Sequence, residues 1–320
     1  MQIHISLQLS KKRVFSFLSI FILEIFSLSA QDPQFSQIFS DRLYLNPALA
    51  GTLECGEFNF NHHNPFPGFG KAYKTITASF DTYIDKIGGG IGVEFLKDSQ
   101  GDGAINTVQF SILYSYKIKL NQNFNLNLGI EAGIIQKKIN FEKLVFNNMI
   151  DPNSVNISNF STENLNSFKK NELDFSTGIA LYSKTIFAGI SVFHLNSIKK
   201  YQQNSFPPKI MIYLGKKINF NKFENENNLL TLAPFVAYKQ QDVEKQFFYG
   251  IFFEKNIISV AVMFNQNLKL NSFSPVLSIE IKYSKFRIAY SYEIKLTKYY
   301  SVPTHSHEIS ISRELLCRKK

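Results

Sequence analysis

The chain has 320 residues, a formal net charge of +10 at pH 7, 44% hydrophobic and 15% aromatic residues, with no Trp and 2 Cys. A single β-sandwich or β-barrel of this size can form one domain with a large core. After the first segment, residues 1–30, no stretch carries the long uncharged apolar run of a membrane-spanning helix, which excludes a helical membrane protein.

Residues 1–30 have the features of a secretory signal peptide. The basic run from Lys11 to Arg13 precedes an apolar run from Val14 to Phe26, and Ser27 to Ala30 supply the small residues of a signal-peptidase site. The apolar run is shorter than the roughly 18 residues of a spanning helix. No cysteine follows the small residues, which disfavours a lipoprotein. We therefore expect an exported protein.

The next segment, from Gln31 to Thr52, is polar and rich in turn residues. Its pairs Asp32-Pro33 and Asn46-Pro47 indicate extended or turning backbone, because proline fixes φ and disfavours helix in the residue before it. Apolar residues between the pairs could hold the segment against another part of the protein: Phe35, Phe39, Leu43, Tyr44 and Leu45. The alternative is a mobile mature N-terminus.

The rest of the chain alternates apolar and polar residues with the period of β-strands. One example sets Val108, Phe110, Ile112, Tyr114, Tyr116 and Ile118 against Gln109, Ser111, Leu113, Ser115, Lys117 and Lys119. This period predicts fourteen strands, at 57–63, 73–81, 87–97, 104–119, 122–137, 172–183, 185–194, 208–218, 228–239, 243–254, 256–265, 273–283, 285–294 and 306–313.

The predicted connections favour a membrane barrel over a soluble sandwich. Outer-membrane barrels alternate short periplasmic turns with longer outer loops. With the N-terminus in the periplasm, the even-numbered connections should be short, and most are; exceptions are the long connection 219–227 and the short outer turn 240–242. We therefore predict an all-β fold, a single transmembrane antiparallel β-barrel at 57–314, after a signal peptide at 1–30 and a periplasmic segment at 31–56 and before a tail at 315–320.

Polar residues of the predicted barrel would point into its lumen if the apolar face meets lipid. They could tune conductance as a pore lining, or pair across a narrow or plugged lumen and hold the barrel in shape. The charged members of this set are Glu94, Lys117, Glu131, Asp174, Glu280, Lys282, Arg287 and Glu293.

No stretch provides a convincing metal or phosphate site. The residues 98–103 resemble the start of a calcium loop, but Gln109 stands where a bidentate Glu is needed. The glycines at 88–92 lack the Lys-Ser/Thr of a phosphate loop, and we expect them to bend a strand or to let a barrel wall approach contents of the lumen. His62 and His63 are adjacent, so on a strand they face opposite sides. We predict no metal and no cofactor.

An outer-membrane hydrolase would need a nucleophile, a histidine and an orienting group that converge. The residues 306–308, Ser-His-Glu, are consecutive on a strand and do not converge, so we predict no enzyme. Cys55 precedes the first strand and Cys317 follows the last, and barrel closure makes these strands neighbours. We hypothesise a disulfide between them, since the periplasm permits disulfides; the alternative is two free thiols.

The basic charge is expected to meet anionic lipid or a negatively charged partner, because nucleic acid is an improbable target for an exported barrel. The connection 138–171 is rich in Asn and Ser and carries Phe146, Ile150, Phe160 and Phe168. A loop of this length usually indicates function or disorder, and its outer position makes it a candidate docking site for a partner.

The segment behind the signal peptide resembles the mature N-terminus of the PorP/SprF family, outer-membrane proteins of type IX secretion and gliding motility in Bacteroidetes. The residues that carry the resemblance are Asp32, Pro33, Gln34, Phe35, Ser36, Tyr44, Asn46, Pro47 and Gly51. Later similarities include Pro67 to Tyr73 and Gly88 to Gly92. Two departures are Phe66, where the family pattern has tryptophan, and the tail beyond Glu314.

The resemblance implies a non-enzymatic component or accessory of type IX secretion, in the outer membrane, that docks or anchors a secreted surface protein. Its implied partners are outer-membrane lipid, a secreted adhesin and periplasmic secretion machinery, with no nucleic acid and no small-molecule substrate. The segment 31–52 would then lie at the periplasmic face or enter the lumen and plug it. The rival functions are a porin or solute channel and an outer-membrane enzyme.

Overall fold

The structure is a computed structural model that describes residues 32–53, 55–67, 73–144, 167–199, 206–220, 230–269, 271–296, 304–315 and 317. The expected signal peptide lies outside these residues, as do positions 145–166 of the long connection proposed as a docking site. Within the described ranges, no helix has both the length and the apolarity needed to cross a membrane.

The chain forms one antiparallel sheet whose strands follow each other in sequence order. The first strands are β1 (Gly56–Asn64), β2 (Tyr73–Ile84), β3 (Gly89–Gln100), β4 (Ile105–Lys119), β5 (Asn125–Ile139), β6 (Phe168–Tyr182) and β7 (Ile186–Phe193). The remaining strands are β8 (Lys209–Lys216), β9 (Ile218–Phe220), β10 (Leu230–Gln241), β11 (Glu244–Lys255), β12 (Ile258–Asn267), β13 (Ser272–Tyr283), β14 (Phe286–Lys295) and β15 (Thr304–Leu315).

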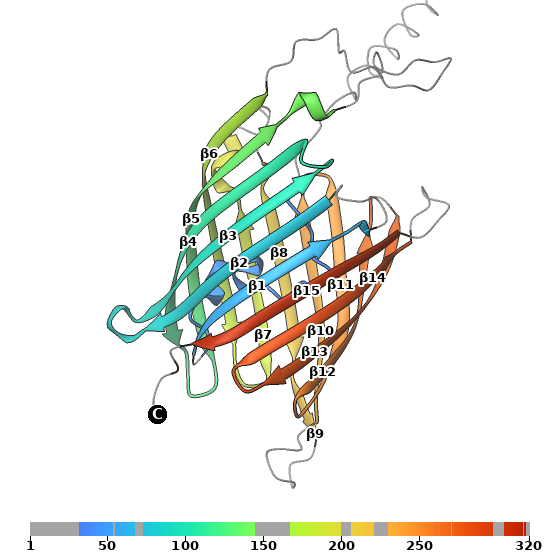
Figure 1. Ribbon diagram of the computed structural model, residues 1–320. Helices are drawn as coiled ribbons and strands as arrows, with labels where there is room; N and C mark the ends of the chain where they lie inside the picture. The colour runs from blue at the N-terminus through green and yellow to red at the C-terminus, as the bar shows by residue number, and fades with distance from the viewer. Residues whose placement is uncertain are drawn as a thin grey trace, which may run out of the picture.

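The sheet closes on itself because β1 pairs with both β2 and β15, and β10 pairs with both β8 and β11. β9 also pairs with β10, so β8 and β9 are one wall strand interrupted at Lys217. The result is a closed 14-stranded antiparallel β-barrel with strongly tilted strands (Figure 1). Both the predicted fold and the predicted number of strands are confirmed.

The two ends of the barrel differ in their connections. At one end lie short turns, among them η3 (Asp85–Ile87), Ser183–Thr185 and the two-residue turn after β11. At the other end β5 and β6 project beyond their neighbours (Figure 1), and the short helix η6 (Leu195–Lys199) follows β7. The short-turn end is the periplasmic end by the rule for outer-membrane barrels.

The outer and inner faces have opposite character. On β4 and β5, Ile112 is 59% exposed and Ile130 is 61% exposed, whereas Ser111 and Ser115 are fully buried. An apolar outer band of this kind belongs in lipid, because hydrocarbon gives polar side chains no hydrogen-bond partners. The apolar face of the barrel therefore points outward, and the polar face is covered by residues inside the lumen.

The barrel seam lies between the first and last strands, as predicted. β15 runs one residue beyond the expected barrel end, to Leu315, which pairs with Gly56. Just outside this ladder, Cys55 and Cys317 form a disulfide with their Cα atoms 4.0 Å apart. The hypothesised pairing is thus the one found in the structure, and it joins parts of the chain 262 residues apart.

Candidate functional site

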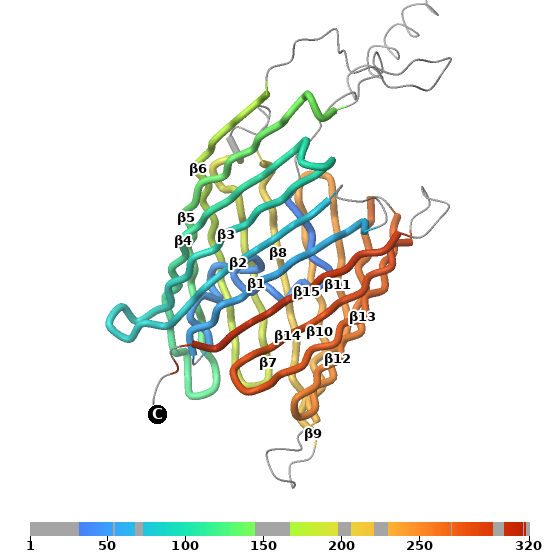
Figure 2. The backbone as a smooth tube through the Cα atoms, viewed as in Figure 1, coloured from blue at the N-terminus to red at the C-terminus, as the bar shows by residue number. Residues whose placement is uncertain are grey.

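The residues Asp32–Leu53, here called the lumen plug, lie inside the barrel (Figure 2). Of the two placements considered for this segment, the structure has the one within the lumen. Leu43 and Leu45 are each 1% exposed, and Asn46 is fully buried. Asp32 contacts the outer ends of β8 and β10, whereas Gly51 contacts the start of β3 near the periplasmic turns. The plug therefore runs through the lumen from its outer half to its periplasmic mouth.

The sequence of the lumen plug explains its compact local shape. Asp41 caps the short helix α2 (Arg42–Leu45), because its carboxylate accepts from the Tyr44 amide at 3.4 Å. Asn46 then caps the 3-10 turn η1 (Pro47–Leu49) by accepting from the Ala48 amide at 2.8 Å. Proline suits the first position of such a turn, since its missing N–H needs no partner there. The Asn46-Pro47 pair, predicted as extended or turning backbone, is thus an extended cap residue followed by the first residue of a turn.

Glycines on the barrel wall let the plug backbone approach very closely. A Cβ atom on Gly129 would lie 2.2 Å from the Ala48 nitrogen, and one on Gly178 would lie 2.0 Å from the Asn46 side-chain oxygen. Either distance is far inside van der Waals contact, so only glycine fits while the plug is in place. The glycines that face the plug in this way come from four wall strands: Gly90 on β3, Gly129 on β5, Gly178 on β6 and Gly189 on β7.

Hydrogen bonds from side chains satisfy buried backbone carbonyls of both the plug and the wall. The Asn46 amide donates to the carbonyl oxygens of Ile179 at 3.0 Å and Ile190 at 3.3 Å. Wall side chains also donate to plug carbonyls: Asn127 to Ala48 at 3.0 Å, Ser115 to Ala50 at 2.6 Å and Ser191 to Leu45 at 2.7 Å. Buried carbonyls need such partners, so the small polar residues of the inner face are matched to this segment.

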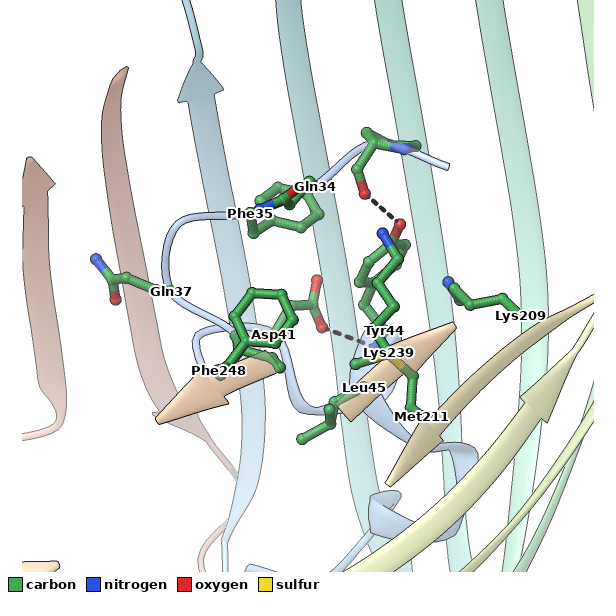
Figure 3. Close-up of a pocket in the computed structure, with 12 residues that line it drawn as sticks. Gln34, Phe35, Gln37, Asp41, Tyr44, Leu45, Lys209, Met211, Lys239 and Phe248 are labelled. Carbon is green, nitrogen blue, oxygen red and sulfur yellow. Dashed lines mark hydrogen bonds between the residues drawn. The ribbon is translucent and has the colours of Figure 1, made fainter. Parts of the chain in front are cut away.

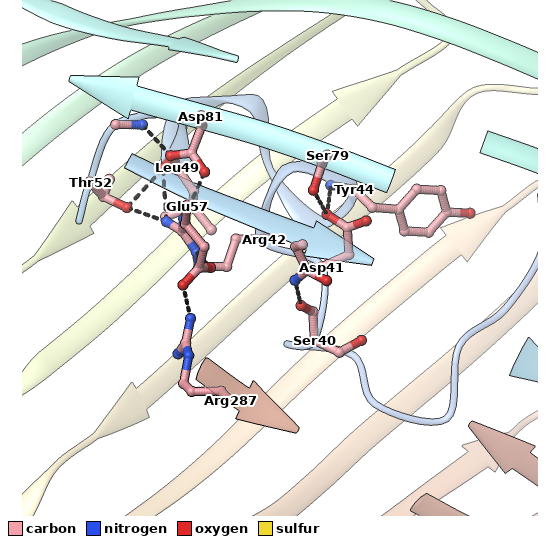
Figure 4. A network of polar contacts seen from close by, with 12 residues as sticks. Ser40, Asp41, Arg42, Tyr44, Leu49, Thr52, Glu57, Ser79, Asp81 and Arg287 are labelled. Atoms are coloured by element: carbon pink, nitrogen blue, oxygen red, sulfur yellow. Dashed lines mark hydrogen bonds and ion pairs between the residues drawn. The ribbon is translucent and has the colours of Figure 1, made fainter. Parts of the chain in front are cut away.

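Arg42 ties the plug to the barrel seam (Figure 4). Its guanidinium donates to Asp81 at 2.8 Å and to the Thr52 hydroxyl at 2.8 Å, and it forms an ion pair with Glu57 at 3.5 Å. Glu57 also pairs with Arg287 from β14. Because these carboxylates are almost fully buried, the two cations supply the charge compensation that buried acids require.

A second charged cluster holds the outer end of the plug. The Asp32 carboxylate lies 2.7 Å from Lys209 Nζ and 3.0 Å from His194 Nε2, and His194 Nδ1 lies 2.9 Å from Asp174. Burial would raise the pKa of Asp32, but the charges of His194 and Lys209 hold it well below its usual value. Burial would lower the pKa of His194, but Asp32 and Asp174 raise it to about 10. The cluster is therefore an ion network at neutral pH.

The extended part of the plug is bound by an acid of β15. Glu308 accepts from the backbone amides of Ser36 at 2.6 Å and Gln37 at 3.1 Å, and from the Ser40 hydroxyl at 3.0 Å. This fully buried carboxylate therefore collects donors that have no partner in a strand ladder. The role of Glu308 in binding the plug was not predicted from the sequence. The one sequence signal for it is its position on the inward face of β15.

Of the consecutive residues Ser306, His307 and Glu308, the strand turns the first and third inward and His307 outward, so the three side chains do not converge. Ser306 faces the lumen, where its hydroxyl lies 2.6 Å from His63 Nε2, whereas His307 is paired with a tyrosine on the outer face. The neighbouring Ser36 hydroxyl donates to Glu293 at 2.6 Å. Ser306 is fully buried and His63 is 2% exposed.

Aromatic rings pack around the plug on the remaining side. Phe39 makes an edge-to-face contact with Phe235 at a centroid distance of 4.8 Å and with Phe187 at 5.7 Å. Phe35 contacts Tyr44 edge-to-face at 5.1 Å, and the Tyr44 hydroxyl donates to the Pro33 carbonyl at 2.7 Å (Figure 3). The cavity beside Phe35 and Tyr44 is small, about 30 Å³.

The predicted lumen charges are on the inward face, in two groups. Glu94, Glu131, Asp174 and Glu293 are at most 5% exposed. Lys117, Glu280 and Arg287 are half-buried nearer the periplasmic end, where Lys117 lies over the Tyr83 and Tyr182 rings. Lys282, at the end of β13, is exposed. The roles of Asp32, Lys209 and Lys239 as lumen charges were not predicted. The alternation of residue types along a strand does not show which segment fills the lumen.

The other candidate groups stay apart from the plug. Asp98 accepts from Thr75 at 2.6 Å and from Gln100 at 2.8 Å, so its carboxylate already has partners. His62 lies on the outward face of β1, opposite to His63. Among the described residues, the one group with metal-ligand spacing is Cys55, Glu314 and Cys317, whose two sulfur atoms form the disulfide.

Comparisons with known proteins give a family and a fold. A family model described as type IX secretion system membrane protein PorP/SprF matches residues 27–312. No curated protein matches the chain. Among solved structures, the CymD monoaromatic hydrocarbon channel has a TM-score of 0.49 at 10% identity, covering 87% of this chain and 93% of its own. A Pseudomonas aeruginosa FadL homologue has a TM-score of 0.45 at 10% identity, covering 84% and 92%. Omp33 of Acinetobacter baumannii has 0.47 at 6% identity, covering 82% and 98%.

Proposed function

Because the chain belongs to the PorP/SprF family of type IX secretion system membrane proteins, we propose that it docks or anchors a secreted surface protein at the outer membrane. The chain is an outer-membrane β-barrel, which gives such a partner a fixed place in the envelope. We further propose that its role is not enzymatic and that any contribution to gliding motility runs through the anchored protein.

The observation that best supports this proposal is the plug. An open 14-stranded barrel would have room for a pore, but here buried contacts fill the middle of the lumen from Asp32 to Gly51. A segment bonded to most of the wall strands leaves no room for the permanently open, water-filled channel of a general porin. A protein that holds a partner at the membrane needs a sealed barrel, so that the membrane stays tight.

The test is affinity purification of the tagged protein from mild-detergent extracts of its own outer membrane. We expect a large exported protein to remain bound, and to be lost from the cell surface when the gene is deleted. A second tagged outer-membrane barrel serves as the control for adventitious binding. Recovery of only periplasmic machinery would replace client docking with a core secretion role.

Planar-bilayer recording of the same preparation tests the rival porin function. We expect no stable open state in the wild type. Steady conductance from a barrel purified without any partner would contradict the docking proposal and support a channel.

A further inference from the structure

We propose that the periplasmic mouth of the lumen binds an extended, apolar peptide segment of a partner protein through one basic residue. This inference rests on the proposed function, because it specifies how a protein partner would be held. It concerns the cavity below the lumen plug, here called the vestibule, and not the plug contacts themselves.

The vestibule has the size and lining of a binding site. Its volume is about 410 Å³, within the range of roughly 300–1,000 Å³ that is usual for ligand pockets. The plug contributes Leu45, Leu49 and Leu53, and the wall contributes rings of Phe187 and Phe252. Apolar surface of this extent, left against water at the mouth of a barrel, gains free energy when apolar side chains cover it.

The vestibule opens to the periplasm. Its lining includes Tyr182 and Ser183, where β6 meets a short turn, and Glu254 at the corresponding end of β11. The plug closes the other side, because Phe39 and Arg42 form its roof. A ligand therefore reaches the vestibule from the periplasmic side.

A buried donor in the lining calls for a backbone-like ligand. The Gln37 side chain is 9% exposed, lines the vestibule, and its amide nitrogen has no hydrogen-bond partner within the part of the chain that the structure describes. A buried amide without an acceptor is costly, and a carbonyl oxygen of an entering peptide would satisfy it. An apolar hydrocarbon without polar atoms would leave it unpaired.

The charges of the lining select a basic residue. Arg42 and Arg287 are compensated by Asp81 and Glu57, so they leave little positive charge for a ligand. Two further carboxylates, Glu254 and Glu280, form no ion pair among the described residues; the strand register places both opposite Ser259 on adjoining strands. They lie about two strand spacings apart, roughly 10 Å, which suits one ammonium or guanidinium group between them.

The opposite wall limits how basic the segment can be. Lys217, at the break between β8 and β9, also lines the vestibule. It would repel a strongly cationic peptide, so the basic residue must approach from the side of β11 and β13. The expected ligand is thus a mostly apolar segment with a single Lys or Arg.

The first experiment uses the purified full-length protein in detergent micelles and fluorescein-labelled nonapeptides, read by anisotropy. The probe contains two Phe, one Leu and one Lys among Ser and Gly; in matched peptides Glu replaces the Lys, or Ser replaces the apolar residues. We expect the Lys peptide to bind about 5-fold to 10-fold more tightly than the Glu peptide. Equal affinity for the Lys and Glu peptides would overturn the inference. So would equal affinity for the Lys peptide and for the peptide in which Ser replaces the apolar residues.

Variants locate the binding. E254Q/E280Q should remove the preference for Lys over Glu, and Ala261→Phe, which places a ring in the vestibule, should abolish binding of every peptide. The matched control is Glu172→Gln, an acid at the outer end of β6 that pairs with Lys170 at 2.8 Å. Its affinity for the Lys peptide should equal that of the wild type. Heat-modified electrophoretic mobility verifies that each variant is a folded barrel.

The inference and the proposed function can fail separately. If Ala261→Phe still retains the exported protein during affinity purification, docking stands and the vestibule is not its site. If the wild type retains no exported protein but binds the Lys peptide selectively, the vestibule stands as a peptide site and the client-docking proposal falls.

Discussion

Replacing Asn46 with alanine should loosen the plug without unfolding the barrel. Asn46 is fully buried and connects the plug to the wall through the carbonyl oxygens of Ile179 and Ile190, and it also caps η1 through the Ala48 amide. The substitution removes the cap and both wall contacts at once.

The magnitude follows from these contacts. Loss of a cap costs about 1 kcal/mol, and each wall hydrogen bond contributes about 0.5–1.5 kcal/mol. The docking free energy of the plug should therefore fall by about 2–4 kcal/mol. This decrease raises the undocked population by about 30-fold to about 700-fold, since about 1.4 kcal/mol corresponds to a factor of ten.

Hydrogen exchange measured by mass spectrometry gives the readout. The plug amides of Asn46 and Leu49, which donate to the carbonyls of Arg42 and Asn46, should lose protection by that factor, while amides of the wall strands keep theirs. Asn265→Ala is the matched control, because Asn265 is a buried lumen asparagine of β12 whose side-chain oxygen has no hydrogen-bond partner among the described residues. Unchanged plug exchange in the Asn46 variant, or equal loss in plug and wall, would refute the reasoning.

Three further changes test the plug and the seam. Gly129→Val should open the lumen, because its Cβ would lie 2.2 Å from the Ala48 nitrogen; planar-bilayer recordings should show conductance that the wild type lacks. Cys55→Ser should lower barrel stability by about 2–4 kcal/mol, seen as a lower urea midpoint in heat-modified mobility. The stability of the charged cluster of Asp32, His194, Asp174 and Lys209, here called the outer latch, should depend on pH. The raised pKa of His194, about 10, gives a contribution that is complete below about pH 6.5 and lost as pH rises through about 10. The lowered pKa of Asp32 gives one that is complete above about pH 4 and lost in stronger acid. A spin label on the first plug residues should therefore become mobile as pH is raised from 6 to 10.5.

Each of these tests has its own control. Gly133 lies on the same strand as Gly129, and Gly133→Ala crowds only Ser111 and the Phe110 carbonyl of the neighbouring strand β4, so it should strain the wall and leave the lumen closed. For the seam, a reducing agent should shift the wild type to the midpoint of Cys55→Ser and leave the variant unmoved. For the latch, Asp32→Asn should give a mobile label at pH 6; a label that stays ordered there would contradict the ion network.

The sequence predicted the wall better than its contents, for a physical reason. A strand needs only an alternation of residue types, which is local, so every predicted strand has its counterpart. The break at Lys217 was not predicted, because the apolar period runs through it. The plug was recognised as a distinct segment, yet its partners could not be named. Asn46 binds residues 133 and 144 positions away, and no local pattern encodes such pairs.

Partners of the buried charges were unpredictable for the same reason. Glu57 and Arg287 are 230 positions apart and meet only because the barrel closes. The glycines were visible, and those at 88–92 were expected to bring a wall near the contents of the lumen. Gly129 on β5, which lies against Ala48, has the sequence context of any small residue in an alternating strand. Only the structure shows its role.

The two halves of the plug are held by different forces, and this determines which half can move. Its outer half is bound by ion pairs and hydrogen bonds, such as those of Asp32 and Ser36, whose groups water can solvate once the segment leaves, and by the rings of Phe35 and Phe39. Its periplasmic half inserts backbone between glycines and buries Leu43 and Leu45, and water offers no substitute for that packing. We infer that release begins at the outer end, while the roof of the vestibule stays in place. A partner seated on the periplasmic side would then reinforce the half that is already rigid, so docking and a sealed membrane are compatible in one barrel.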